Sequence, residues 1–352
     1  PPRSTLFPYT TLFRSPYLQA VTQNSIVVMA VCDTKSDVTV DFGKTADYGK
    51  QSVGTKFLKP QGKQRFVFRI KLEGLEPNTV YNYKVTQDGE STGNETFRTA
   101  AGPGAPFRFG IFGDCRSNPD VHAMVITGLK KADPYFSVYT GDLCADGKYE
   151  TWMREFFIDR QLDLIKNVPF FNNVGNHEGS GANTKAFLEA PESPSGSQFF
   201  YSFEYGDAFF LVLNSNEDIK PGSKQYEFAV NAVKSTRKKW KAASWHAPAY
   251  GAGGHGPDKK MQEFTKSVLV PAGFDFVFNG HSHFYQHNFV DGIRHLIIGG
   301  GGAPLYSPAK DTYTVKSAKS YNFALAEVKP ASFKITVYNE KSQIIDVIEI
   351  IK

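Results

Sequence analysis

Cysteine is scarce in this sequence of 352 residues, which has only Cys32, Cys115 and Cys144. Three cysteines are too few for a disulfide framework, and because their number is odd at least one thiol stays unpaired. A fold held together mainly by disulfide bonds is therefore excluded. Cysteine usage does not decide between an oxidising and a reducing compartment.

Long apolar runs are also missing, since none reaches the roughly 18 residues that a membrane-spanning helix needs. Charge of one sign is only slightly in excess: 40 Lys and Arg stand against 35 Asp and Glu, a formal net charge of +5. That excess is too small to indicate nucleic-acid binding. We expect no membrane span and no nucleic-acid partner other than as a substrate. The sequence does not indicate which oligomeric state the protein adopts.

The first 15 residues, PPRSTLFPYTTLFRS, are rich in Pro, Thr and Ser and have no steady period. They look like a translated sequencing adapter, so we predict a non-native leader over 1–15 and leave it out of the fold argument. A native amino terminus, and a signal peptide with it, would then have been lost. The rest of the chain suits about two domains of roughly 100–200 residues each.

Residues 16–100 contain short runs in which apolar and polar side chains alternate, as in 25–31 and 66–70. This period of two, broken by turn residues, predicts antiparallel strands. The segment 74–85 (GLEPNTVYNYKV) resembles the late-strand signature of fibronectin type III sandwiches, in which a tyrosine near a strand start ties the corner. Tyr81 is the candidate for that role, and we predict a structural all-β sandwich here.

A short linker of small and helix-breaking residues, 101–106 (AGPGAP), follows the predicted sandwich. From 107 to 352, strand-like apolar runs alternate with segments of helical character such as 123–132 and 152–166. This alternation predicts an α/β domain, which further strands over 322–350 would complete.

Five short polar motifs each close an apolar run in this second domain. Strands of an α/β sheet present their chemistry where they end, so we expect the motifs to meet at one site. Their carboxylate, amide and imidazole groups suit Mn, Zn or Fe better than Ca or Mg alone. The motifs are Gly113-Asp114, Gly141-Asp142, Gly175-Asn176-His177-Glu178, Trp245-His246-Ala247-Pro248 and Gly280-His281-Ser282-His283.

These motifs, in this order, resemble those of the calcineurin-like metallophosphoesterases, and in particular those of the purple acid phosphatase branch. The resemblance extends to the phrases HAPAY at 246–250, GHSHFY at 280–285 and GGGGAPLY at 299–306. It covers the chain from about 107 to the carboxyl end, and a preceding fibronectin-like domain is typical of that branch. It implies an α/β sandwich with two central mixed β-sheets flanked by helices.

The resemblance also implies a centre of two metal ions, divalent or trivalent and drawn from Fe, Zn and Mn. Asp142 would bridge both ions. Asp114 and His283 would hold the first ion, and Asn176, His246 and His281 would hold the second. His177 would not bind metal but would lie beside the substrate phosphate. Both His177 and Asp142 would be catalytic residues. The full set of implied metal ligands is Asp114, Asp142, Asn176, His246, His281 and His283.

Two positions depart from the family pattern. Many members carry a histidine two residues after the first aspartate, where this chain has Arg116, and purple acid phosphatases carry a metal-binding tyrosine where it has Ala145. The first metal would lack both supplementary ligands, and the tyrosine-to-iron charge transfer that gives the purple colour would be absent. Arg116 is predicted either to contact the substrate phosphate or to pair with Asp146 or another nearby acid.

Other residues near the motifs have weaker signals. His255, in a glycine-rich run, is a further candidate for substrate contact. Cys115 and Cys144 are expected to approach each other as a disulfide or as two buried thiols, with a thiolate metal ligand from Cys144 as an alternative. The glycine run 299–302 lacks the Lys-Ser/Thr ending of a phosphate-binding P-loop, so it predicts tight packing near the site.

We therefore predict a metal-dependent phosphomonoesterase of the acid phosphatase kind, which hydrolyses a small-molecule phosphate ester with a water that two metal ions activate. Two alternatives stay open. One is a phosphodiesterase of the same fold. The other is a secreted binding protein whose metallophosphoesterase domain is degenerate because the first metal lacks its usual ligands. We also predict a secreted or periplasmic location.

Overall fold

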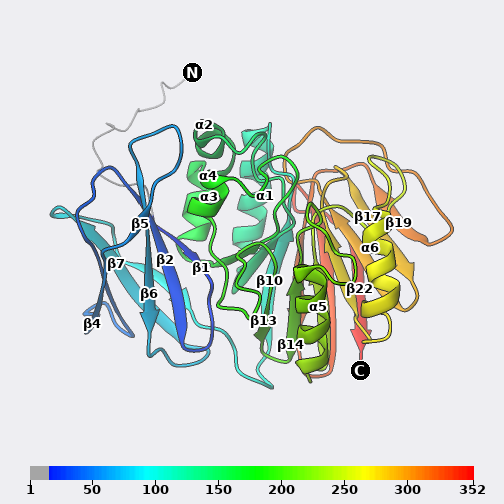
Figure 1. Ribbon diagram of the computed structural model, residues 1–352, viewed down its shortest axis with the longest axis horizontal. Coiled ribbons are helices and arrows are strands. Elements are labelled where there is room, and N and C mark those ends of the chain that lie inside the picture. The colour runs from blue at the N-terminus through cyan, green and yellow to red at the C-terminus, as the bar shows by residue number, and fades with distance from the viewer. Residues whose placement is uncertain (1–15) are drawn as a thin grey trace.

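The structure, a computed structural model, describes residues 16–352. The strands of these residues form three β-sheets (Figure 1). The leader predicted over 1–15 lies outside the described residues. The strands of the first region are β1 (Tyr17–Gln19), β2 (Ser25–Cys32), β3 (Val38–Gly43), β4 (Lys50–Gly54), β5 (Phe57–Leu58), β6 (Phe66–Glu73), β7 (Val80–Gln87), β8 (Glu90–Ser91) and β9 (Glu95–Arg98).

The second region combines strands with short helices. Its strands are β10 (Phe107–Phe112), β11 (Phe136–Tyr139), β12 (Phe170–Asn172), β13 (Tyr201–Tyr205), β14 (Ala208–Val212), β15 (Trp240–Ser244), β16 (Phe276–Asn279), β17 (Tyr285–Val290), β18 (Ile293–Ile298), β19 (Thr314–Ala318), β20 (Asn322–Val328), β21 (Ser332–Asn339) and β22 (Ile344–Ile351). Its helices are α1 (Pro119–Lys131), α2 (Tyr149–Thr151), α3 (Asp159–Ile165), α4 (Ala182–Phe187), α5 (Lys224–Ser235) and α6 (Lys259–Phe264), with π-helical turns η1 (Trp152–Phe156) and η2 (Thr265–Leu269). Within 16–352, no helix has both the length and the apolar character needed to cross a membrane.

The amino-terminal region forms a β-sandwich, as its period of two predicts. Strands β1, β2, β6 and β5 lie side by side in one sheet, and β4, β3, β7 and β8 in the other, with β9 paired to β7. The Tyr81 hydroxyl accepts a hydrogen bond from the backbone N–H of Glu76 at 2.9 Å. This bond confirms the tyrosine corner predicted from the sequence.

The carboxyl-terminal region is an α/β sandwich built on two mixed sheets, which confirms the predicted fold class. In one sheet β10, β11 and β12 run parallel and β20 lies antiparallel beside β10. In the other, β14, β15, β16 and β18 run parallel while β13 and β17 run antiparallel to their neighbours. Helices α1 and α3 pack against the first sheet, and α5 and α6 against the second (Figure 1).

The two regions share one sheet, which the sequence pattern does not reveal. Strand β1 pairs in parallel with β12, so a ten-stranded sheet runs from the sandwich into the α/β region. The linker is fixed as well, because the N–H of Gly206 donates to the Ala101 carbonyl at 3.0 Å and the N–H of Gly104 to Asp207 Oδ1 at 2.9 Å. Strand pairing and the hydrogen bonds of the linker therefore hold the sandwich against the α/β region.

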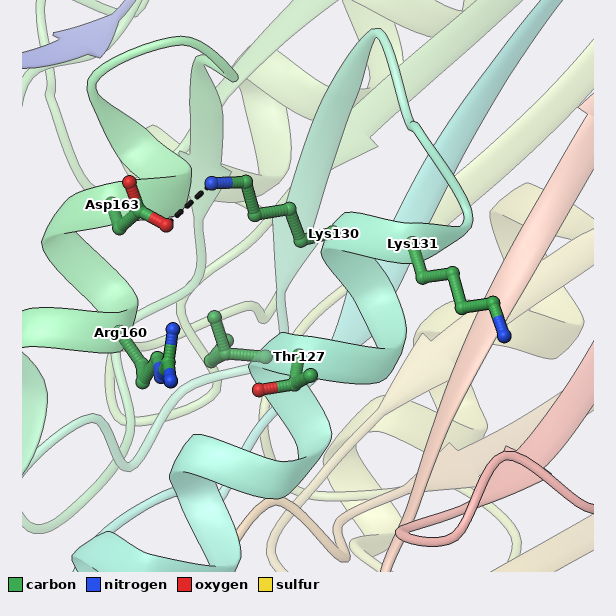
Figure 2. Close-up of a pocket in the computed structure, with 6 residues that line it drawn as sticks. Thr127, Lys130, Lys131, Arg160 and Asp163 are labelled. Atoms are coloured by element: carbon green, nitrogen blue, oxygen red, sulfur yellow. Dashed lines mark hydrogen bonds and ion pairs between the residues drawn. The ribbon is translucent and has the colours of Figure 1, made fainter.

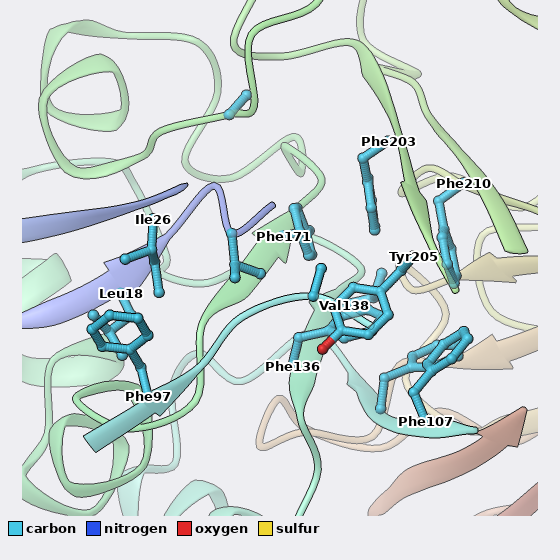
Figure 3. Close-up of a cluster of buried hydrophobic side chains, with 14 of the residues drawn as sticks. Leu18, Ile26, Phe97, Phe107, Phe136, Val138, Phe171, Phe203, Tyr205 and Phe210 are labelled. Carbon is cyan, nitrogen blue, oxygen red and sulfur yellow. The ribbon is translucent and has the colours of Figure 1, made fainter. Parts of the chain in front are cut away.

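Phenylalanine rings fill the core between the two mixed sheets (Figure 3). Phe109 of β10 is fully buried, and its ring centroid lies 4.9 Å from that of Phe136 and 5.3 Å from that of Phe210. The rings of Phe278 and Phe333 are each 6.1 Å away. Because these rings come from both sheets, their packing fixes the spacing of the strands whose ends carry the polar motifs.

One predicted helical segment is interrupted in the structure. Residues 152–166 divide into η1 and α3, and Phe157 between them has φ −79° and ψ 44°. Phe156 and Phe157 are adjacent and both buried. A regular helix would turn neighbouring side chains roughly 100° apart, so the break lets both rings enter the core. Helix α5 was not predicted, and its start is capped by Ser223, whose hydroxyl accepts a hydrogen bond from the N–H of Tyr226 at 3.2 Å.

Candidate metal centre

Polar residues follow the carboxyl ends of strands at one edge of the two mixed sheets. Asp114 lies just beyond β10, and Asp142 just beyond β11. His246 follows β15, and His281 and His283 follow β16. Parallel strands end at the same edge of a sheet, so the topology brings these aspartates and histidines together.

Asp114, Asp142 and His283 form a buried cluster of metal-ligand type. One ligand atom of each lies within 4.8 Å of the other two. His283 Nε2 is 3.5 Å from Asp114 Oδ1, and His246 Nε2 is 3.2 Å from Asp142 Oδ1. The structure thus gathers the three residues expected at the first metal and one residue expected at the second.

Carbonyl oxygens fix the two buried imidazole rings from their outer sides. His246 Nδ1 lies 2.7 Å from the Thr140 carbonyl oxygen, and His283 Nδ1 lies 2.8 Å from the Pro304 carbonyl oxygen. A carbonyl only accepts, so each Nδ1 donates its proton and each Nε2 faces the carboxylates. His246 Nε2 is buried and has no hydrogen-bond partner within 16–352. A buried nitrogen held beside carboxylates in this way fits a metal ion.

His281 and Asn176 join the predicted set less directly. The backbone N–H of His281 donates to both carboxylate oxygens of Asp114 at 3.0 Å, and its ring centroid lies 5.0 Å from that of His246. Asn176 is exposed on the loop after β12. In the described part of the chain, no hydrogen bond ties its side chain to the other five predicted ligands, so its role stays a prediction.

Three predicted ligands have left-handed backbone conformations. The φ angle is 56° at Asp114, 54° at Asp142 and 68° at His281. Non-glycine residues seldom adopt this region, and such strain persists only where the surrounding contacts hold it. The backbone at this edge is therefore fixed to aim side chains into one site.

Glycines leave room for the cluster. A Cβ at Gly175 would lie 2.1 Å from Asp142 Oδ1. In the run 299–302, a Cβ at any of the four glycines would lie 2.7 Å or less from a neighbouring atom. This crowding confirms the tight packing predicted for that run.

Gly175→Ala is expected to weaken metal binding about 10- to 100-fold, because the new Cβ would displace Asp142, whose backbone nitrogen lies only 2.2 Å from its position. Titration of the metal-free protein with Zn²⁺ measures the change. Gly181→Ala is the control on the same loop, since a Cβ there would meet nothing within 4 Å. Unchanged Zn²⁺ affinity in folded Gly175→Ala protein would contradict this prediction.

Burial and neighbouring charges set the protonation of the cluster. Burial raises the pKa of Asp114 well above its usual value. Burial also acts against a charged Asp142, but His246 holds the pKa of Asp142 below its usual range. In turn the two aspartates outweigh burial and raise the pKa of His246 to about 10, so this ring is protonated near pH 7 and its Nε2 proton must leave when a metal ion binds there. Burial lowers the pKa of His281 to about 3 and that of His283 to about 4, so both rings are neutral near pH 7 and able to bind a metal.

The loop after β12 is tied to Asp142. The backbone N–H of His177 donates to Asp142 Oδ1 at 3.0 Å, and His177 Nδ1 lies 2.8 Å from the Ala145 carbonyl oxygen. His177 Nε2 is left 3.8 Å from Asp142 Oδ2. Glu178 Oε1 accepts hydrogen bonds from the N–H groups of Asp142 at 3.1 Å and Gly175 at 2.8 Å. The sequence motif contains Glu178 but gave no sign of this role.

The family profile of the calcineurin-like phosphoesterases matches residues 107–285, about half of the chain. The chain belongs to the calcineurin-like phosphoesterase family. The profile of the purple acid phosphatase N-terminal domain matches residues 15–99, ahead of the phosphoesterase domain. Both matches agree with the order of the two folded regions and with the family resemblance of the motifs.

Relatives of this chain include plant proteins. The chain is 29% identical over 231 residues to a probable purple acid phosphatase 20 of Arabidopsis thaliana, covering 60% of this chain and 53% of that protein. It is 27% identical over 301 residues to purple acid phosphatase 22 of the same plant, covering 77% of this chain and 67% of that protein. The chain thus spans about half to two thirds of the length of these curated relatives.

Solved structures share the fold. Purple acid phosphatase PPD1 from yellow lupin (Lupinus luteus) seeds superimposes with a TM-score of 0.80 at 18% identity, covering 96% of this chain and 74% of that chain. A structure of PhoD superimposes with a TM-score of 0.72 at 12% identity, covering 97% of this chain and 94% of that chain. At these identities the similarity shows the fold alone.

Arg116 lies against the cluster of candidate metal ligands. Its Nε is 3.5 Å from Asp142 Oδ2, and its Nη2 is 3.4 Å from His283 Nε2. Asp146 instead pairs with Lys148 at 2.7 Å. Of the acids considered as partners for Arg116, the structure thus selects Asp142.

Two aromatic rings cover the outer histidines of the candidate site. His255 is exposed, and its ring stacks on that of His281 with centroids 4.2 Å apart. Tyr306 stacks on His283 at 4.3 Å and lies 5.2 Å from the His255 ring. His255 therefore lies beside the cluster, where a substrate contact was predicted. Tyr306 received no role from the sequence because a single tyrosine after a glycine run has no distinctive spacing.

All three cysteines are buried free thiols. Of the two arrangements considered for Cys115 and Cys144, the structure has two buried thiols and not a disulfide. Cys115 Sγ donates a hydrogen bond to the Leu143 carbonyl oxygen at 3.4 Å. Burial raises the pKa of both thiols well above their usual value. Within the described residues, the group that could hold a metal ion is Asp114, Asp142 and His283 and includes no cysteine, which argues against a thiolate ligand from Cys144.

A separate surface hollow lies between α1 and α3 (Figure 2). Lys130 pairs with Asp163 there, while the side chain of Lys131 points away from that pair. The hollow shares no residue with the cluster of candidate metal ligands. Its lining residues are Ile126, Thr127, Lys130, Lys131, Arg160 and Asp163.

Proposed function

We propose that this protein is a metal-dependent phosphomonoesterase whose site is built around Asp114, Asp142, His246 and His283. The observation that carries the proposal is the buried pair of carboxylates faced by two imidazole Nε2 atoms, each ring being fixed by a carbonyl oxygen on its outer nitrogen. Oxygen and imidazole donors together suit Zn, Mn or Fe. The family match supports phosphate ester chemistry at such a site.

We propose two metal ions per chain, with the Asp142 carboxylate shared between them. When bound, such ions supply Lewis acidity, which stabilises negative charge on phosphoryl oxygens and makes water more acidic. Fe, Zn and Mn are the proposed identities. The residues that would hold the ions are Asp114, Asp142, Asn176, His246, His281 and His283.

His177 is proposed as the residue that protonates the leaving group. Its Nδ1 donates to the Ala145 carbonyl oxygen, so Nε2 is the atom left to face a substrate, and 33% of the side chain is exposed. Water adds to phosphorus, the bond between phosphorus and the leaving oxygen breaks, and that oxygen takes the Nε2 proton of a doubly protonated His177 to leave as an alcohol. His177 is then neutral and keeps its remaining proton on Nδ1.

Substrate phosphate contacts are proposed for Arg116 and His255 as well as for His177. A guanidinium offers paired donors to phosphate oxygens, and Arg116 lies within 3.5 Å of Asp142 Oδ2. His255 covers His281 from the exposed side. A small-molecule phosphate monoester is the proposed substrate, and a secreted or periplasmic location remains a proposal that cell fractionation tests.

His177→Asn is expected to lower kcat about 100-fold for an alkyl ester such as glycerol phosphate, because the alkoxide must be protonated as it leaves. For 4-nitrophenyl phosphate, whose phenolate leaves without a proton, the loss is expected to be about tenfold or less. Steady-state assays with added Zn²⁺, Mn²⁺ or Fe²⁺ measure both. His255→Asn is the matched variant, expected to raise KM for both esters alike. Equal losses of kcat on the two esters in His177→Asn would contradict the proton-donor role.

A monoester preference is tested in the same assays by comparing 4-nitrophenyl phosphate with bis(4-nitrophenyl) phosphate. The monoester is expected to be hydrolysed with the higher kcat/KM. A higher value for the diester would replace the proposal with a phosphodiesterase of the same fold.

A further inference from the structure

Arg116 brings a fixed positive charge to one side of the cluster of proposed metal ligands. Its Nε lies 3.5 Å from Asp142 Oδ2 and its Nη2 lies 3.4 Å from His283 Nε2. Only 13% of its side chain is exposed. Asp142 and His283 are two of the three residues proposed to hold the first metal ion, so the guanidinium faces the same groups that this ion would bind.

The backbone around Arg116 is fixed on both sides. The Cys115 carbonyl packs directly against Gly302, because a Cβ added to this glycine would lie only 2.7 Å from the carbonyl oxygen. The Arg116 carbonyl accepts the N–H of Asn118, the residue that caps α1, at 3.0 Å. Ser117 between them has a left-handed φ of 72°. The backbone from which the guanidinium reaches Asp142 is thus held by a constrained loop.

Arginine differs from the histidine that many members of the family carry at this position. A histidine can lose its proton and donate a lone pair to a metal, whereas a guanidinium remains charged at any working pH and only donates hydrogen bonds. Arg116 Nε is buried without a hydrogen bond of normal geometry to any residue in 16–352. Its contact with Asp142 is therefore chiefly one of opposite charges, and a metal ion at the same carboxylate would be repelled at short range.

We infer that Arg116 is the resident counter-ion of Asp142, and that the metal ion held by Asp114, Asp142 and His283 binds in competition with its guanidinium. The inference rests on the proposed function. Asp142 is proposed to be shared by both ions, but Arg116 approaches its Oδ2 and also His283 Nε2, whereas His246 Nε2 approaches its Oδ1. Within the described residues no arginine forms an ion pair or hydrogen bond with His246 or His281, so the competition acts mainly at the first site. The two ions are therefore bound with unequal affinity. Arg116 lowers the affinity for the ion at the first site, which is the more weakly bound of the two.

Calorimetric titration of the metal-free full chain with Zn²⁺ tests this inference without measuring activity. The wild-type protein is expected to bind two ions whose affinities differ at least about tenfold. Arg116→Gln, which removes the charge, is expected to tighten the weaker event about 10- to 100-fold and leave the tighter one unchanged. Arg116→Lys keeps the charge and is expected to keep the weaker event weak. Arg160→Gln, at an exposed position on α3, is the control.

Circular dichroism tests whether each variant is folded. If Arg116→Gln does not fold, Arg116→Met, which is similar in length and uncharged, replaces it, and the same tightening of the weaker binding event is expected. Two equally tight sites in the wild-type protein would overturn the inference and leave the proposed function intact. An unchanged weaker affinity in the folded uncharged variant would do the same. Absence of Zn²⁺ binding in every folded variant would overturn the inference and the proposed function together.

Discussion

Asp142→Asn is expected to slow hydrolysis of phosphate monoesters by about a thousandfold or more. The Asp142 carboxylate is 1% exposed and lies 3.2 Å from His246 Nε2, 3.8 Å from His177 Nε2 and 3.5 Å from Arg116 Nε. An amide keeps nearly the same shape but removes the negative charge that these groups share. The loss is expected in kcat, measured with 4-nitrophenyl phosphate at saturating Zn²⁺, Mn²⁺ or Fe²⁺.

Asp146→Asn provides the matched control for this prediction, because the same change is made on the same loop. Asp146 is paired with Lys148 at the surface. Its replacement is expected to change kcat by about twofold or less. An Asp142→Asn protein that kept more than about a tenth of the wild-type kcat would show that Asp142 is not part of the reaction centre.

Phe109→Ala is expected to lower the free energy of unfolding by about 3–5 kcal/mol. The ring is fully buried and contacts the rings of Phe136, Phe210, Phe278 and Phe333, which come from both mixed sheets. Its removal leaves a cavity that the two sheets cannot close without moving the strand ends that carry the metal cluster. Denaturant unfolding, with the midpoint and slope compared to the wild-type protein, measures the loss.

The matched control for the core is Phe289→Ala. Phe289 is 46% exposed, and the guanidinium carbon of Arg294 lies 4.9 Å from its ring centroid. The expected loss is about 1 kcal/mol or less. A Phe109→Ala protein as stable as the Phe289→Ala protein would contradict the role given to the inter-sheet core.

The placement of the cluster could be predicted because strand ends carry a clear sequence signal. Asp114 and Asp142 each follow a short apolar run and a glycine, and parallel strands of one sheet end at one edge. The corner at Tyr81 was also readable, since its local sequence fixes a contact only five residues away, to Glu76. Local patterns and the direction of parallel strands were sufficient for these features.

Contacts between distant segments could not be predicted in the same way. The pairing of β1 with β12 joins residues about 150 positions apart and leaves no periodicity in either strand. The stacking of Tyr306 on His283 and the turn of Arg116 toward Asp142 depend on loop backbones that only the folded chain defines. The sequence identified Arg116 as unusual, but its choice of Asp142 over Asp146 required the structure.

Metal content per chain is the most direct test of the proposed centre. The wild-type protein, produced with Fe, Zn and Mn supplied and purified without chelators, is desalted and analysed by elemental analysis beside Asp142→Asn and Asp146→Asn. We expect at least about one ion per chain in the wild-type and Asp146→Asn proteins and a clear loss in Asp142→Asn. Folded wild-type protein that carried no more metal than Asp142→Asn would contradict a metal centre at this cluster, and the proposed hydrolysis with it.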